Sequence, residues 1–135
     1  MLIMSINKLI LGTVQMGLPY GINNSLGIIT IQESYKILKA SYLAGIRLLD
    51  TAETYGNAHK IIGDFHKLNP KYKFNVITKM PPLEKIDNIE EKVSNYLNEM
   101  RIEKLECLMF HSYESYKKNL KILPLLEKLK TQCLI

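Results

Sequence analysis

Four short apolar runs alternate with amphipathic helical stretches along this chain. The runs cover residues 8–12, 45–50, 74–79 and 105–111, with few polar residues inside them. Nearly continuous apolar strands are typical of a parallel sheet that is covered on both faces. Parallel neighbours need a crossover connection, which is usually a helix and is right-handed. The alternation therefore predicts an α/β fold built from four βα units.

Local signals mark where the helices begin and end. Thr30 followed by Glu33 is a capping box, and Gly45 fits the left-handed residue that closes a helix. A second helix is expected to start at Asn57 and to end at Asn69-Pro70. Asp87 and Glu90 mark the start of a third helix. Pro124 is tolerated in the first turn of a last helix.

The composition excludes several classes of protein. The chain has 135 residues and a net charge of +5, but its lysines are scattered and Trp is absent, which favours solvated helices over a nucleic-acid surface. No apolar run reaches the ~20 residues that a membrane span needs. Cys107 and Cys133 have no metal-ligand spacing, and Cys107 lies in an apolar run, where we expect it to be buried. We also expect no signal peptide and a cytoplasmic location.

Polar side chains stand at or just after the ends of three of these runs. Asp50, Lys79 and His111 each end a run, and Tyr55 follows Asp50 in the sequence DTAETYG. Taken singly, these residues could be a turn cap, a solvated strand end, a structural histidine and a packed loop aromatic. The carboxyl ends of parallel strands meet at one rim, which is where a βα-barrel keeps its chemistry. Together the four predict a proton-transfer site.

The motifs around these residues resemble the aldo-keto reductase family. LGTVQMG at residues 11–17 resembles the family's first strand and loop, and LDTAETYGN at 49–57 resembles its second-strand signature. VITK at 76–79 and FHS at 110–112 look like the strands that deliver the family's lysine and histidine. The loop GLPYG at 17–21 is similar to that of bacterial members associated with sugar-polymer genes.

The resemblance implies a (β/α)8 TIM-barrel fold and NAD(P)H-dependent reduction of a small carbonyl compound. Tyr55 would be the proton donor, Lys79 would favour its phenolate form, and Asp50 would hold Lys79 in place. His111 would orient and polarise the carbonyl. The resemblance assigns cofactor contacts to Gly12, Thr13 and Asp50. From the residue composition and spacing alone, we expect no metal, no nucleic-acid partner and no membrane partner.

The chain departs from the family pattern in two ways. His59 stands where the family usually has an acidic residue. A complete barrel has about 250 residues, so we expect residues 1–135 to be one incomplete barrel domain, truncated to about the first four βα units. Later strands supply the family's phosphate contacts, so the NADPH or NADH site would be incomplete and activity weak.

Several alternatives stay open at this point. The exposed edges of a half-barrel favour self-association, so a homodimer, a gene fragment and a non-catalytic interaction module all fit the sequence. A flavodoxin-like domain would share the alternation, but it gives no reason to place Tyr55, Lys79 and His111 together. The sequence does not identify the substrate or decide between NADPH and NADH.

Overall fold

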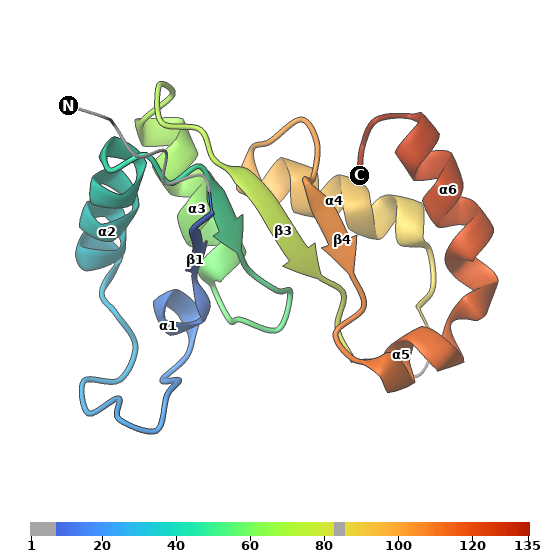
Figure 1. Ribbon diagram of the computed structural model, residues 1–135, viewed down its shortest axis with the longest axis horizontal. Helices are drawn as coiled ribbons and strands as arrows, with labels where there is room; N and C mark the ends of the chain where they lie inside the picture. Colours follow the sequence, from blue (N-terminus) through green and yellow to red (C-terminus); the bar gives the residue numbers. More distant parts are fainter. Residues whose placement is uncertain (1–7, 83–85) are drawn as a thin grey trace.

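A single parallel sheet organises the chain (Figure 1). The computed structural model describes residues 8–82 and 86–135. The sheet has four strands in the order β1-β2-β3-β4, and each neighbouring pair is parallel. The strands are β1 (Ile10–Gly12), β2 (Leu48–Asp50), β3 (Asn75–Lys79) and β4 (Cys107–Met109). The predicted α/β fold with parallel neighbours is confirmed.

Helices connect the strands and extend beyond the last one. They are α1 (Val14–Gly17), α2 (Ile31–Leu43), α3 (Ala58–Leu68), α4 (Ile89–Met100), α5 (Tyr113–Lys118) and α6 (Leu123–Thr131), with a 3₁₀ turn at Leu120–Ile122. The short helices α1 and α5 were not predicted, because each is too short to show a periodic apolar pattern. None of the described helices is long and apolar enough to cross a membrane.

The helix caps agree only in part with the sequence signals. The Thr30 hydroxyl accepts the Glu33 amide at 3.2 Å, as predicted, and Gly45 has a φ of +97°. Asn57 occupies the N-cap of α3 but makes no side-chain capping bond. The prediction for α4 was one residue early: Asn88, not Asp87, caps it by accepting the amide of Glu91, and Glu90 lies in the first turn.

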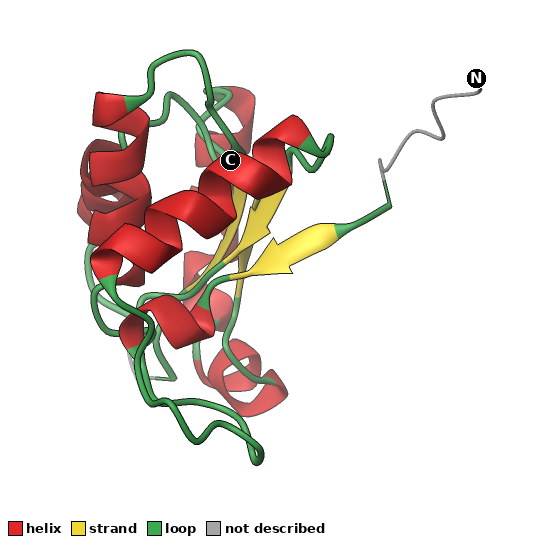
Figure 2. Cartoon of the chain, turned by 90° about the vertical axis from the view of Figure 1, so that its left-hand side faces the viewer, coloured by secondary structure: helices red, strands yellow, loops and turns green. Residues whose placement is uncertain are grey.

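The main core lies between one face of the sheet and the helices. Leu49 of β2 and Val76 of β3 are register partners, so their side chains point to the same face, and both are fully buried. They pack with Leu38, Ile62, Phe65 and Met100, contributed by α2, α3 and α4. Figure 2 shows these long helices grouped on one side of the sheet.

The opposite face of the sheet is only partly covered, which corrects one prediction. Apolar strands indicated cover on both faces, but Cys107 and Met109 of β4, which share this face with Ile77 and Lys79, are only half-buried. Cys107 is one of the residues that we expected to be buried. Next to and within β1, at the edge of the sheet, Leu9 and Ile10 are 55% and 50% exposed. Among the described residues no further strands face this side, so some apolar side chains of the strands stay partly exposed.

Candidate functional site

Asp50 and Lys79 form the centre of the candidate site. Asp50 ends β2 and is paired in register with Ile77, two residues before Lys79 at the end of β3, so both side chains leave the same face. Lys79 Nζ lies 2.7 and 2.8 Å from the two carboxylate oxygens of Asp50 and 3.0 Å from the Thr51 carbonyl oxygen. An ammonium has three donors, and these contacts engage all of them.

Tyr55 lies beside this ion pair. Its loop follows β2, and Lys79 Nζ is 5.3 Å from the centre of its ring. The Tyr55 amide donates to the Ala52 carbonyl at 3.0 Å, which closes the turn that carries the phenol. Gly17 backs directly against this turn, since a Cβ there would overlap the Tyr55 carbonyl oxygen and lie 2.8 Å from its carbonyl carbon.

His111 lies further along the same rim. β4 ends at Met109, the register partner of Lys79, and His111 follows two residues later. Its Nδ1 is buried and has no hydrogen-bond partner among the residues that the structure describes. Within those residues, no hydrogen bond or ion pair joins His111 to Asp50, Tyr55 or Lys79. The imidazole is therefore at the rim but is not tied to the other three.

Gly12 and Thr13 bring the end of β1 to the site. Gly12 is the register partner of Asp50, and Thr13 donates both its amide and its hydroxyl to the Asp50 carbonyl oxygen, each at 3.0 Å. A Cβ at Gly12 would meet nothing within 4 Å, so open space lies over this strand end. The Thr51 hydroxyl is buried and unpaired among the described residues. Open space over the end of β1, on the face that carries the Asp50 carboxylate, is compatible with a ligand.

Sequence reasoning did not find a second polar cluster behind the site. Glu53, in the same loop as Tyr55, bonds with Lys92 and Tyr96 of α4. The DTAETYG run contains Glu53, but no local pattern points to its partners on a helix that starts 36 residues later.

His59 joins this cluster on the helix side of the sheet. It is 4% exposed, and its Nε2 lies 2.9 Å from the Thr78 hydroxyl. Its Nδ1 is 3.6 Å from a carboxylate oxygen of Glu99. Burial lowers the pKa of His59 to about 4, against an opposing influence of Glu53. The imidazole is therefore neutral at pH 7 and acts as a hydrogen-bonding core residue.

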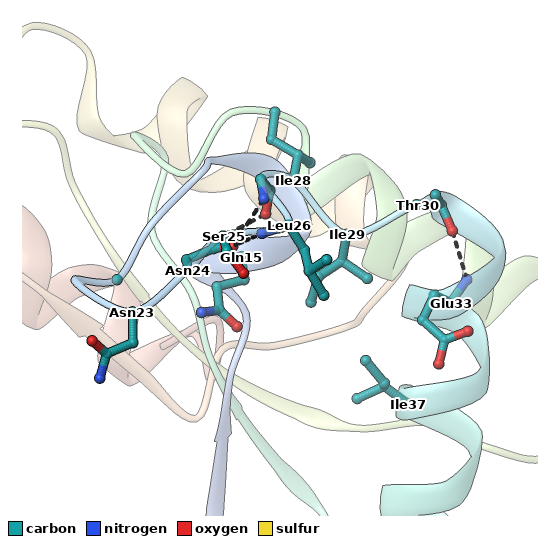
Figure 3. A pocket seen from close by; sticks show the side chains of 12 residues that line it. Gln15, Asn23, Asn24, Ser25, Leu26, Ile28, Ile29, Thr30, Glu33 and Ile37 are labelled. Atoms are coloured by element: carbon teal, nitrogen blue, oxygen red, sulfur yellow. Dashed lines mark hydrogen bonds between the residues drawn. The ribbon is translucent and has the colours of Figure 1, made fainter.

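A cavity of about 780 Å³ lies away from these residues, between the loop of residues 21–30 and α2 (Figure 3). Leu26, Ile28 and Ile37 contribute apolar walls. Asn24 folds the loop by donating to the Gly27 carbonyl and accepting the Gly27 amide, each at 2.9 Å. None of the four candidate catalytic residues lines this cavity.

Comparison with solved structures finds the same fold. The chain is 23% identical to a Pseudomonas aeruginosa protein assigned to the aldo-keto reductases, with a TM-score of 0.73, and the match covers 93% of this chain and 52% of that one. An aldo/keto reductase from Klebsiella pneumoniae, solved with NADP and acetate, gives 20% identity and a TM-score of 0.63 over 93% and 42%. A thermostable aldo-keto reductase solved with the inhibitor epalrestat gives 18% and 0.61 over 91% and 45%.

The chain thus spans about half the length of these structures. Its described residues form four parallel strands, whereas a complete (β/α)8 barrel has eight. Comparison with curated proteins finds no significant match. The family model for aldo/keto reductases, in contrast, matches residues 8–135. This match covers nearly the whole sequence and shows that the chain belongs to the aldo/keto reductase family.

Proposed function

We propose that residues 1–135 form one incomplete barrel domain, the N-terminal half of an NAD(P)H-dependent reductase that converts a carbonyl compound to an alcohol. The observation that carries this proposal is the Lys79 ammonium, which is paired with Asp50 and lies 5.3 Å from the centre of the Tyr55 ring. When hydride adds to a carbonyl carbon, negative charge develops on the oxygen, and that oxygen must take up a proton. A phenol beside a fixed positive charge can provide it.

In this proposal Tyr55 donates its phenolic proton to the carbonyl oxygen. The phenolate that remains is stabilised by the nearby Lys79 ammonium. Since the donors of Lys79 are engaged by Asp50 and the Thr51 carbonyl, Lys79 acts on Tyr55 through its charge rather than through a direct hydrogen bond. Asp50 fixes that charge in position.

His111 supplies the second contact with the substrate. Its Nδ1 is buried and lacks a partner among the described residues, so this atom is out of reach of a substrate. A hydrogen bond from Nε2, the other ring nitrogen, to the substrate carbonyl would orient and polarise that carbonyl. His111 is therefore assigned to orientation and polarisation, while Tyr55 transfers the proton.

Gly12, Thr13 and Asp50 fit the nicotinamide end of a cofactor, because Gly12 leaves open space at the end of β1 next to the Asp50 carboxylate. When bound, NADPH or NADH supplies the hydride. The Klebsiella relative was solved with NADP, which supports this cofactor class. If phosphate contacts lie outside these four βα units, two lost charge-assisted hydrogen bonds would weaken binding by about 10²–10⁴-fold. The four βα units alone would then have negligible activity.

A second candidate is self-association without catalysis. Leu9 and Ile10 are half-exposed at the β1 edge, and exposed sheet edges pair readily with other strands. Two copies related by a twofold axis along the strands would join β1 of each to β4 of the other. A mass measurement in solution tests this candidate: a dimer that dissociates when Ile10→Lys is introduced supports it, and a monomer at high concentration contradicts it.

A cytoplasmic location remains a prediction.

The catalytic proposal is tested by joining this chain to the later strands of the Pseudomonas relative. With a reactive aldehyde as substrate, we expect the chain alone to oxidise NADPH negligibly. We expect the folded fusion to reduce the aldehyde with NADPH at a measurable rate. Tyr55→Phe should reduce kcat of the fusion by at least about 10², whereas Tyr113→Phe, at a tyrosine that is 70% exposed, should not. A folded fusion that binds NADPH and works equally well with Tyr55→Phe would disprove the role of Tyr55. Strong Tyr55-dependent activity of the chain alone would disprove its dependence on the later strands.

A further inference from the structure

Glu53 lies between Asp50 and Tyr55 in the sequence, but its side chain is directed to α4. Lys92 Nζ is 3.0 and 2.9 Å from its two carboxylate oxygens, and the Tyr96 hydroxyl donates to the same carboxylate. Lys92 and Tyr96 are four residues apart and therefore lie on one face of the helix. Lys92 and Glu53 have side chains that are 20% and 34% exposed, so water screens this pair less than a surface pair.

The backbone of Glu53 is fixed at the same time to the strand that carries Lys79. Its amide donates to the Lys79 carbonyl oxygen at 3.1 Å. Two residues later, the Tyr55 carbonyl accepts the amide of Ala58 at 3.0 Å, at the start of α3. Glu53 thus joins three things: the loop with the phenol, the strand with the ammonium, and α4.

The surroundings keep Tyr96 in the form that donates. Burial, together with the bond to the Glu53 carboxylate, raises the pKa of Tyr96 above its ordinary value. The ring of His59 packs edge-on against that of Tyr96, with 5.4 Å between their centres. His59 is neutral at pH 7, so it does not compete with Lys92 for the carboxylate. The cluster therefore has one cation, one anion and one phenol donor in direct contact.

We propose that Lys92 and Tyr96 are positioning residues, which act through Glu53 to hold the Tyr55 ring next to the Lys79 ammonium. This inference rests on the proposed function, because the position of Tyr55 matters only if Tyr55 is the proton donor. The contact between the Tyr55 ring and the Lys79 side chain is present without cofactor or substrate, so it can be measured by itself. A merely structural cluster would stabilise the whole domain. A positioning cluster controls one contact, between the Tyr55 ring and the Lys79 side chain.

The test uses NMR on the 135-residue chain. Tyr96→Phe removes one hydroxyl and leaves the ring, and Lys92→Met removes the charge. We expect either change to weaken the nuclear Overhauser contact between the Tyr55 ring and the Lys79 side chain several-fold. We also expect faster amide hydrogen exchange at Tyr55 and Ala58, by about 10–100-fold from the usual strength of hydrogen bonds to charged groups.

Two further variants sharpen this test. Lys92→Arg keeps the cation and should restore most of the protection. Lys128→Met is the matched control, because Lys128 forms an exposed ion pair at 2.7 Å with Glu90 of the same helix α4. It should leave the Tyr55 contact unchanged. Amides in the middle of α4, such as Val93, should change less than threefold in every variant.

Two outcomes would overturn the inference. One is an unchanged Tyr55–Lys79 contact and unchanged exchange in Tyr96→Phe and Lys92→Met. The other is faster exchange throughout the sheet and α4 with no selective effect at Tyr55, which indicates a general structural role. In the active fusion, Tyr96→Phe should lower kcat about tenfold while KM stays within twofold. If the fusion is inactive but the NMR effects are selective, the proposed function fails and the positioning effect stands.

Discussion

Gly63 is expected to be essential for the packing of α3 against α4. A Cβ at this position would overlap the Glu99 carbonyl oxygen and lie 3.0 Å from the Glu99 carbonyl carbon and 3.2 Å from the Met100 Cα. These are backbone atoms of α4, so no side-chain rotation can relieve the overlap. Helix propensity alone predicts the opposite, since Ala in place of Gly within a helix stabilises by about 1 kcal/mol.

The size of the effect of Gly63→Ala follows from this overlap. Relief of the overlap between this Cβ and the Glu99 carbonyl oxygen would require α3 and α4 to separate by about 1.5–2 Å, because non-bonded heavy atoms are normally about 3.5 Å apart. Overpacking of this kind costs about 1–3 kcal/mol, and backbone contact places it at the upper end. The separation also stretches the 2.8 Å bond between His66 Nδ1 and the Met100 carbonyl, which is worth about 1 kcal/mol. After the propensity gain, we expect a net loss of about 2–3 kcal/mol.

Urea denaturation followed by circular dichroism measures this loss. Gly12→Ala is the matched control, because a Cβ there meets nothing within 4 Å, and its free energy of unfolding should stay within about 0.5 kcal/mol of the unmodified chain. A Gly63→Ala variant that is as stable as the original chain, or more stable, would show that α3 and α4 are not in backbone contact at this point. The packing argument would then be wrong.

Three further changes should have smaller, separable effects. Burial holds the pKa of His59 at about 4, against 6.5 in the unfolded chain, so the unfolded state takes up the proton first as the pH drops. The free energy of unfolding should therefore fall by about 3 kcal/mol from this group between pH 6.5 and 4. In urea melts at several pH values, His59→Gln should remove this part of the pH dependence, and an unchanged pH dependence would contradict the assignment. Thr30→Ala should cost about 1 kcal/mol in the same assay through loss of the α2 cap, and no cost would mean that the cap is not formed in solution. Cys133→Gly should raise the melting temperature slightly, because Cys133 has a φ of +56°, a region that glycine occupies without the strain of a Cβ; a lower melting temperature would contradict this.

The alternation of strands and helices was predictable because its signals are local. The Thr30 N-cap, Gly45 and the first-turn Pro124 act within a few residues of where they stand, and the structure has them as expected. The second bond of the predicted capping box does not form, because the Glu33 carboxylate pairs with Lys36 instead. The α4 cap was misplaced by one residue because Asp87 and Asn88 are adjacent cap formers. Only the turn geometry selects the one whose side chain reaches an amide three residues on.

The position of the candidate site at the strand ends also followed from the sequence. Asp50 and Lys79 end their strands, and parallel pairing brings such ends to the same rim. The sheet sets the register of these two residues, so the order of the strands was enough to predict their ion pair. The sequence did not predict the half-exposed Cys107, since burial depends on what covers a strand and not on the strand's own residues.

The cluster of Glu53, Lys92 and Tyr96 was decided by tertiary structure alone. Glu53 is separated from Lys92 by 39 residues and from Tyr96 by 43, and nothing in either segment specifies the other. Their contact exists because α4 packs beside α3 behind the sheet, which sets the rotation and distance of the helix face. Sequence periodicity determines which face of α4 is apolar. Which loop Lys92 reaches from the edge of that face depends on how the helix layer packs on the sheet.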